Sequence, residues 1–422
     1  MELFDKSKIE KEIPELTNGI LTILHDAAVS VNINSIAIVG GVVRDALINE
    51  KMSSPDLDLT TDATPDQIRH LVEPLADAVW LQGERFGTIG LKFKDLRMEI
   101  TTHRSESYVS DSRKPSVTFS LDIEDDLSRR DFTVNAMAIA VDSGNFLDPF
   151  NGKSDLEDRV LRTPIAPYES FNDDPLRMLR AARFIASYEL TPVKEIVDTA
   201  KELVGRISIV SPERIREELL KLLSLKNPRK GFEFLEQIDL LSRIFPFETS
   251  LNIKNLDKTF ELLTPNDPVM RLSVFLYGIS KTDISKSLKD LRMSRDEIRK
   301  IENIAEFLKK ISEGPNSNNW SNEEIRRIMD ISDWSIQDSV RLLEALDFKD
   351  SDFLHSLHDL NSTEDLTSFE SPLSALEVMD LLDLSPGPVV GQVLFWLKEI
   401  RLKEGPIAPE EAKSRVLQEW KE

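Results

Sequence analysis

Residues 39–61, VGGVVRDALINEKMSSPDLDLTT, decide how the rest of the chain is interpreted. The apolar run that ends at Val39 predicts a buried strand, and Gly40 and Gly41 follow it directly. Backbone without side chains lets N–H groups approach a phosphate closely, and a helix around Arg44 would turn its N-terminus toward the same anion. This part of the chain therefore predicts a phosphate-binding turn.

A pair of carboxylates closes the same stretch. Asp56 and Asp58 flank Leu57, and in an extended strand residues two apart point to the same side. Mg²⁺ usually takes one or two carboxylates together with the phosphates of a substrate. A lone glycine pair is usually a turn and a lone acidic pair a solvated strand end, but the two together predict a metal-dependent nucleotide site.

Composition excludes several classes of protein. The 422 residues suffice for two to four domains, and the absence of cysteine excludes a disulfide framework, a thiolate zinc site and a thiol nucleophile. The first residues are charged and mixed in sign, unlike a signal peptide. No run of about eighteen apolar residues occurs, so no membrane-spanning helix is expected. We therefore expect a cytoplasmic protein that does not enter a membrane.

The charge distribution bears on nucleic-acid binding. The net charge of −22 argues against it, but residues 175–230 contain twelve Lys and Arg against seven Asp and Glu. Phosphate contacts need Lys and Arg, so a basic band on an acidic body is typical of RNA held at one surface. Ordinary helix-face charge is the alternative.

Strand and helix patterns alternate over the first hundred residues and predict a small α+β palm. Helices are expected within residues 6–30 and over 64–76, and strands over 78–81, 88–93 and 97–102. Glu99, on the last strand, would bring a third carboxylate near Asp56 and Asp58 and take the proton from an attacking hydroxyl. A strand-surface Glu is the alternative. The polar residues 103–128 predict a mobile loop.

Three motifs in this order resemble one family. Residues 37–61 resemble the signature of the nucleotidyltransferase superfamily that includes polymerase β, in particular tRNA nucleotidyltransferases (CCA-adding enzymes) and class II bacterial poly(A) polymerases. RRDFTVNAMAI at 129–139 resembles the family's second motif, which implies that Arg130 and Asp131 contact the sugar and phosphates of the nucleotide. SFNDDPLRMLRAARF at 170–184 resembles a third motif, which acts in the family as a protein template.

The third motif carries the expected base selection. On one helix Asp174, Arg177 and Arg180 would share a face. The resemblance implies that Asp174 and Arg177 read the edges of CTP and ATP, while Arg180 and Arg183 support the nucleotide. An acceptor and a donor can pair with the amine-bearing edges of cytosine and adenine, whereas the carbonyl of guanine or uracil would leave the Asp unpaired.

The resemblance also implies a domain plan. We expect a polymerase-β-like α+β head at 1–155, with a small mixed sheet and helices, and then only helices: a neck with base recognition at 156–230, a body at 231–330 and a tail with tRNA contacts at 331–422. In many relatives the body carries a metal-binding phosphohydrolase segment. Tyr277 and Gly278 stand in the places of its His and Asp, so we expect no hydrolase activity.

The function implied is template-independent addition or repair of the 3′ CCA of tRNA from CTP and ATP, with two Mg²⁺ ions, by a monomer or homodimer. In the family a flexible loop at the position of 103–128 is associated with the final A, which favours full CCA addition. A poly(A) polymerase or a specialised CC- or A-adding enzyme is the first alternative. An inactive RNA-binding protein on the same fold is the second.

Overall fold

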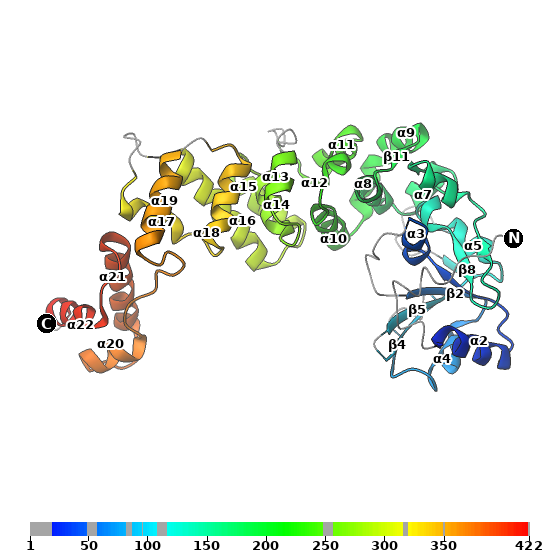
Figure 1. The fold of residues 1–422 in the computed structure, drawn as a ribbon, viewed down its shortest axis with the longest axis horizontal. Coiled ribbons are helices and arrows are strands. Elements are labelled where there is room, and N and C mark those ends of the chain that lie inside the picture. The colour runs from blue at the N-terminus through cyan, green and yellow to red at the C-terminus, as the bar shows by residue number, and fades with distance from the viewer. Residues whose placement is uncertain are drawn as a thin grey trace. The chain divides into compact units, whose positions relative to one another are not determined.

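The structure is a computed structural model that describes residues 19–48, 57–81, 87–94, 96–107, 116–247, 256–314, 320–348 and 351–420 (Figure 1). The chain divides into two compact units. The N-terminal unit contains Met1–Leu222 and Lys230–Pro246, and the C-terminal unit contains Leu223–Arg229 and Phe247–Glu422. The finer division into head, neck, body and tail stays a prediction.

A mixed sheet forms the base of the N-terminal unit, as predicted. Among the described residues it has seven strands, with β2 and β5 parallel and all other neighbours antiparallel. Their spatial order is β3 (Ala78–Trp80), β4 (Thr88–Phe93), β5 (Leu96–Thr102), β2 (Leu57–Thr61), β1 (Ile36–Val39), β8 (Ala138–Ala140) and β9 (Phe146–Leu147).

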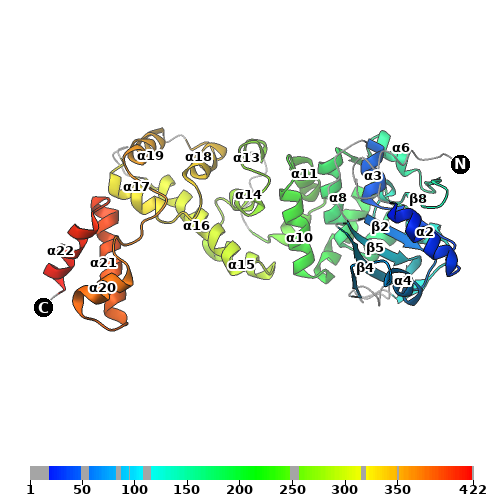
Figure 2. The ribbon, with the colours of Figure 1, turned by 60° about the horizontal axis from the view of Figure 1, so that its bottom comes forward.

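Two helices cover one side of this sheet. α2 (Ile20–Ser30) and α4 (Pro65–Val72) pack on the apolar side chains of the strands, which alternate with polar ones at the period of two expected for a half-covered sheet (Figure 1 and Figure 2). α4 begins at the predicted place, with Thr64 as N-cap and Pro65 in its first turn. α2 and α4 do not cover the opposite side of β2 and β5, and polar side chains lie there.

The region 103–128 corrects one expectation, since part of it is regular structure. β6 (Arg104–Ser107) pairs antiparallel with β7 (Ser116–Phe119), and α5 (Ile123–Ser128) follows. The Asp122 side chain caps α5 by accepting from Glu124 N at 2.9 Å. The polar composition of this region predicted a loop. A two-stranded ribbon can have the same composition, because it can be solvated on both sides and needs no continuous apolar side. Residues 108–115 lie outside the described ranges.

Helices make up most of the remaining N-terminal unit. A 3₁₀ turn, η3 (Thr133–Asn135), leads to β8, and the short parallel pair of β10 (Val160–Leu161) and β11 (Thr191–Pro192) ties two helical segments together. The helices are α6 (Gly152–Glu157), α7 (Pro167–Asp173), α8 (Leu176–Tyr188), α9 (Lys194–Leu203), α10 (Pro212–Leu223), α11 (Arg229–Gln237) and α12 (Leu240–Ile244), with the 3₁₀ helix η4 (Val204–Ile209) before α10.

The described part of the C-terminal unit is helical, as predicted, and holds two apolar clusters. The first gathers α13 (Leu256–Leu262), α14 (Pro268–Phe275), α16 (Arg295–Ser312), α17 (Asn322–Met329), α18 (Ile336–Ala345) and α19 (Ser351–Thr363), with α15 (Lys281–Asp290) alongside α16. The second gathers α20 (Ala375–Leu382), α21 (Pro388–Glu404) and α22 (Pro409–Glu419). Within the described ranges, no helix combines the length and apolarity needed to cross a membrane.

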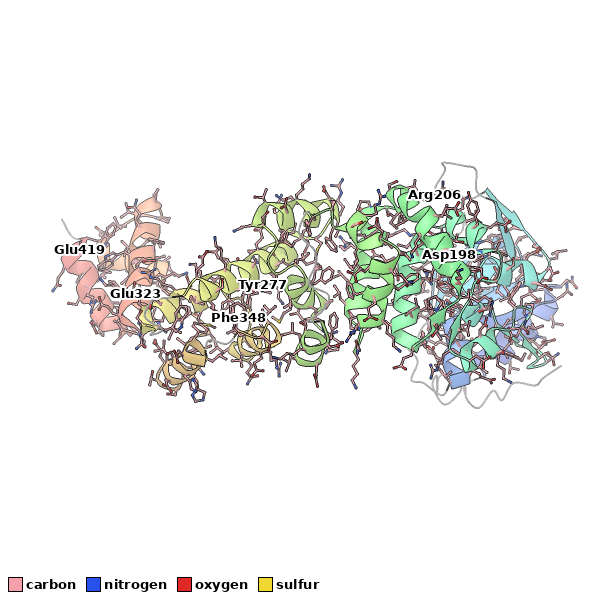
Figure 3. The ribbon with its side chains drawn as sticks, turned by 90° about the horizontal axis from the view of Figure 1, so that it is seen from above. Asp198, Arg206, Tyr277, Glu323, Phe348 and Glu419 are labelled. Atoms are coloured by element: carbon pink, nitrogen blue, oxygen red, sulfur yellow. The ribbon has the colours of Figure 1, made fainter. Side chains whose placement is uncertain are left out.

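Tyr277 has a packing role in the first of these clusters. Its ring lies edge-on to that of Phe348, with centroids 6.0 Å apart (Figure 3). The side chain at the position where the resemblance would place a His is therefore part of an aromatic contact.

Arg271, on α14, is completely buried and donates to backbone carbonyls. Its guanidinium nitrogens bond the oxygens of Phe260 and Leu263, and those of Leu223 and Leu225. Burial lowers the pKa of Arg271 to about 10. The side chain thus joins chain segments whose carbonyls have little access to water.

Replacing Arg271 with Met should destabilise the C-terminal unit by about 3–5 kcal/mol, because several buried carbonyls lose their donor at once. Urea unfolding followed by circular dichroism measures this. Arg295→Met, which removes an exposed guanidinium at the start of α16, is the matched control and should leave the midpoint unchanged. Equal midpoints for the two variants would contradict the role given to Arg271.

Candidate active site

Asp58 and Glu99 lie side by side on the open side of the sheet. The parallel register of β2 and β5 pairs them directly, and both are exposed while their neighbours along each strand are buried. Adjacent strands are about 4.8 Å apart, so the two carboxylates can share a cation. Asp56 lies outside the described residues, and within the described ranges no three Asp, Glu or His side chains gather into a metal site.

The glycine turn lies next to Asp58. Gly40 adopts φ 77°, and a Cβ there would stand 3.2 Å from Arg130 Nη1 and 3.5 Å from Asp58 Oδ2. Only glycine suits both this backbone conformation and this space. α3 (Gly41–Ile48) begins immediately after the turn, so its first N–H groups are available to an anion. A carboxylate, a cation and a helix N-terminus thus meet at one point.

Arg44 is buried in the second turn of α3 and is fully engaged with protein groups. Its Nε donates to Asp45 Oδ1 at 2.8 Å and its Nη1 to Asn135 Oδ1 at 2.5 Å. Its guanidinium carbon lies 4.3 Å from the ring centroid of Tyr188, whose hydroxyl donates to Asp45 Oδ1 at 3.1 Å. Burial raises the pKa of Tyr188 further above its ordinary value. Arg44 therefore braces the turn, and its predicted phosphate contact stays a prediction.

The second motif is held together by two buried aspartates. Asp126 pairs with both Arg129 and Arg130, the latter at 3.3 Å. Burial alone would raise the pKa of Asp126, but Arg130 and Arg129 hold it below its usual range. The pairing fixes Arg130 beside Gly40. Sequence reasoning missed Asp126, which reads locally as one of several acidic residues in the first turn of a helix.

Asp131 has no unused carboxylate oxygen in this structure. Its Oδ1 accepts from Phe132 N and Asn135 Nδ2, each at 2.9 Å, and its Oδ2 accepts from Arg180 Nε and Nη2 at 2.9 and 2.5 Å. The side chain is nearly buried. Asp131 therefore positions Arg180, and the sugar contact that the resemblance implies for it is untested.

The arginines of α8 are bound by groups from other elements, and two of them, Arg180 and Arg183, pair with acidic side chains. Arg177 donates from Nη1 to Ser170 Oγ at 2.7 Å and from both terminal nitrogens to the backbone carbonyls of Arg129 and Arg130. Arg183 donates to Glu218 Oε2 at 2.8 Å, and Arg180 also reaches Glu218. Arg177 thus clamps the second motif, and it would have to give up these bonds to read a base.

Glu218, on α10, was not expected at this site. Burial alone would raise the pKa of Glu218, but Arg183 and Arg180 lower it. In the sequence it is one Glu in an ordinary amphipathic run, so no local signal marks it. Glu218 thus supplies negative charge from α10 to two of the arginines of α8, Arg180 and Arg183.

Asp174 corrects a second expectation, because it does not lie on the helix of Arg177. α7 ends at Asp173 and α8 begins at Leu176, and Asp174 between them has extended backbone angles. Pro175 disfavours helical geometry at the residue before it, which explains the break. The carboxylate of Asp174 is about one-fifth exposed and accepts from Arg214 Nη2 at 2.8 Å. Arg214, itself about half exposed, thus holds the carboxylate of Asp174 in an ion pair.

The pairing of Asp131 with Arg180 predicts an acid-sensitive fold. Burial by itself would raise the pKa of Asp131, but Arg180 and Asn135 outweigh it and hold that pKa well below 3.8. A carboxyl group whose pKa is lower in the folded than in the unfolded state stabilises the fold at any pH above its unfolded pKa. This stabilisation is lost as the pH falls, here below about pH 4. Denaturant unfolding between pH 7 and pH 2 should show this loss in the wild type.

The Asp131→Asn variant should be less stable at pH 7 and lose less stability on acidification than the wild type. Asp198→Asn, at an exposed position of α9, is the control and should keep the wild-type pH profile. Parallel profiles for wild type and Asp131→Asn would count against this account.

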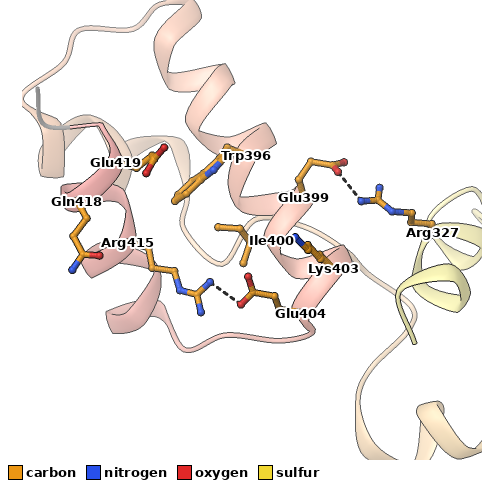
Figure 4. A pocket seen from close by; sticks show the side chains of 9 residues that line it. All are labelled: Arg327, Trp396, Glu399, Ile400, Lys403, Glu404, Arg415, Gln418 and Glu419. Atoms are coloured by element: carbon orange, nitrogen blue, oxygen red, sulfur yellow. Dashed lines mark hydrogen bonds and ion pairs between the residues drawn. The ribbon is translucent and has the colours of Figure 1, made fainter. Parts of the chain in front are cut away.

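A hollow of about 410 Å³ lies in the C-terminal unit, between α17, α21 and α22 (Figure 4). Trp396 forms part of its wall, and two ion pairs border it, Arg327 with Glu399 at 2.9 Å and Arg415 with Glu404 at 2.8 Å. It contains none of the predicted site residues. The candidate active site, around Gly40, Asp58 and Glu99, lies instead on the open side of the sheet in the N-terminal unit.

Comparison with family models places these features in a known class. Residues 36–162 match the poly(A) polymerase head domain, and residues 190–250 match the probable RNA- and SrmB-binding site of polymerase A. The fold and the site define a nucleotidyltransferase with a polymerase-type head.

Curated relatives narrow the class. The CCA-adding enzyme of Staphylococcus aureus (strain MRSA252) is 34% identical over 64% of this chain and 64% of its own length, and that of Lactobacillus helveticus is 31% identical over 65% and 68%. A solved CCA-adding enzyme in an apo form is 25% identical, covers 99% of this chain and 100% of that one, and superposes with a TM-score of 0.69. The chain spans about two-thirds of these curated relatives. It belongs to the family of CCA-adding tRNA nucleotidyltransferases and bacterial poly(A) polymerases.

Proposed function

We propose that the protein adds or repairs the 3′-terminal CCA of tRNA, using CTP and ATP and no nucleic-acid template. The observation that carries this proposal is the meeting of Gly40, Asp58 and Arg130 at the start of α3, with Glu99 in register beside Asp58. A turn that accepts phosphate next to paired carboxylates suits transfer of a nucleotidyl group to a hydroxyl. The relatives named above carry this activity in their names.

Asp56 and Asp58 would hold Mg²⁺ in this proposal, because carboxylate oxygens are ligands that the ion prefers. Two bound Mg²⁺ ions would neutralise the triphosphate and favour the ionised form of the attacking RNA hydroxyl. Glu99 accepts the proton of that hydroxyl. Gly40 and Gly41 admit the phosphates close to the backbone, and Arg130, fixed by Asp126, supplies positive charge.

Base selection belongs to Asp174, with Arg177 and Arg180 behind it. Asp174 is held by Arg214 but remains partly exposed, so its carboxylate can accept from the exocyclic amine of cytosine or adenine. Uracil and guanine present a carbonyl there and leave the carboxylate without a donor. Arg177, by fixing the backbone of Arg129 and Arg130, keeps this reader in register with the phosphate turn.

Extension of a tRNA that lacks CCA tests the proposal. We expect CTP alone to add two residues, ATP alone to add none, and both together to add three and stop. Repeated addition from ATP alone would instead indicate a poly(A) polymerase, which the match of the head domain keeps as the second candidate. Addition of CC only, or of A only to a tRNA ending in CC, would indicate a specialised enzyme. The absence of any addition would indicate an inactive RNA-binding protein.

We further propose that the enzyme acts in the cytoplasm, where tRNA and its nucleotide substrates are found, and as a monomer or homodimer. Light scattering at assay concentration, with and without tRNA, distinguishes the two oligomeric states.

A further inference from the structure

A row of four residues crosses the open side of the sheet and ends in an exposed aromatic ring. The strand registers pair Asp58 with Glu99, Glu99 with Gly90, and Gly90 with Trp80. Residues paired across neighbouring strands point to the same side. Trp80 therefore lies on the side of the proposed carboxylates, three strands away from Asp58, or about 14 Å.

Trp80 is not a core residue that happens to reach the surface. Its neighbour Val79 packs against the apolar cluster under the sheet, so alternation turns Trp80 to the opposite side, where 43% of it is exposed. Gly90 leaves room for the indole, since a Cβ at Gly90 would lie 3.3 Å from Trp80 Cε3. The ring thus lies over Gly90, on the strand next to that of Glu99.

Two cations adjoin this row. Lys92 pairs with Arg97 in the register of β4 and β5, and each lies two residues from the row, so both face the same side. Arg97 is exposed and Lys92 is partly exposed. An aromatic ring beside positive charges is the combination that binds a single nucleic-acid strand.

The place of this surface relative to the phosphate turn selects its ligand. In the sheet order, β1 with the glycine turn lies on one side of β2, and β5, β4 and β3 lie on the other. Nucleotidyl transfer needs the attacking hydroxyl roughly in line with, and opposite to, the leaving pyrophosphate. If the triphosphate lies at the turn, the RNA strand comes from the side of Trp80.

We propose that Trp80 is a stacking platform for an unpaired base of the RNA primer, and that Lys92 and Arg97 hold phosphates of the same strand. This inference rests on the proposed function, because the side of approach follows from the position of the triphosphate. The separation between Asp58 and Trp80 exceeds one nucleotide, so the stacked base is the one before the 3′-terminal nucleotide.

Steady-state kinetics test the stacking. Trp80→Ala and Trp80→Leu should raise KM for a tRNA lacking CCA by about 10- to 100-fold, the range for loss of one base–aromatic stack, with kcat and CTP affinity nearly unchanged. Trp80→Phe should retain most of the affinity, since it keeps a ring. Tyr168→Leu, at an exposed aromatic of α7, is the control and should behave as the wild type. Wild-type KM in Trp80→Leu would overturn the proposal.

Direct binding separates this inference from the proposed function. A hairpin RNA with 2-aminopurine before its 3′-terminal nucleotide should be quenched by the wild type and Trp80→Phe, but not by Trp80→Leu, with no nucleoside triphosphate present. Quenching without any nucleotide addition would remove the proposed function and leave the platform. Addition by the wild type without quenching would remove the platform alone.

Salt dependence gives a second measurement that does not depend on the folding of Trp80 variants. Lys92→Ala and Arg97→Ala should each lower the slope of log affinity against log salt by about 0.7, as expected for one phosphate contact to a single strand. An unchanged slope in both variants would contradict the assignment of these cations.

Discussion

The Asp58→Ala variant should lose CTP and ATP incorporation by on the order of 10³-fold or more, while its affinity for tRNA stays nearly unchanged. Charge stabilisation by a metal-bound carboxylate contributes several kcal/mol in the transition state, and about 1.4 kcal/mol corresponds to a factor of ten. Asp58 stands between Gly40 and Glu99, so its removal takes away charge at the reacting phosphate without touching the RNA surface.

Single-turnover incorporation at saturating tRNA measures this effect, and filter binding measures the tRNA affinity. Asp66→Ala is the matched control, because Asp66 is an exposed carboxylate in the first turn of α4, on the covered side of the sheet. It should leave incorporation intact. Near-normal incorporation by Asp58→Ala would show that the catalytic centre lies elsewhere.

Changing Asp174 to Asn should alter which nucleotides are used. The amide can donate to the carbonyl of uracil, so the preference for CTP over UTP in kcat/KM should fall by about 10²-fold or more. Part of the change should come from a lower rate with CTP, because the charged acceptor is gone. Incorporation assays with each of the four nucleoside triphosphates measure it.

Two further variants separate the role of the Asp174 carboxylate from that of the surrounding charges. Asp173→Asn, one residue earlier at the end of α7, removes the same charge and should preserve the preference. Arg214→Ala keeps the carboxylate of Asp174 but frees it from its partner, and should cost less than the loss of the carboxylate itself. An unchanged CTP preference in Asp174→Asn would mean that Asp174 is a structural partner of Arg214 only.

Local patterns predicted the chemistry of the glycine turn and of the carboxylates, because both predictions follow from a few consecutive residues. The alternation of β2 and β5, the capped start of α4 and the turn at Gly40 all depend on short-range geometry. The break before α8 was also legible in Pro175, but the helical spacing of the arginines concealed it.

Pairing partners could not be found in this way. Arg180 meets Asp131 and Glu218 across 49 and 38 residues of chain, and Arg177 reaches a backbone 47 and 48 residues away. Such contacts depend on how α8 and α10 pack against the second motif. No periodicity within one segment encodes them.

The amino-acid sequence by itself determined the class of the fold, the order of the three motifs and the kind of chemistry they serve, since residue type and spacing fix local geometry and ligand preference. The tertiary structure fixed the pairing of Glu99 with Asp58, which the sequence had left open against a strand-surface Glu. It alone committed Arg177 and Asp131 to protein partners and carried the row of paired residues across to Trp80. Strand register and helix packing bring together side chains that are tens of residues apart, and they are properties of the whole folded unit.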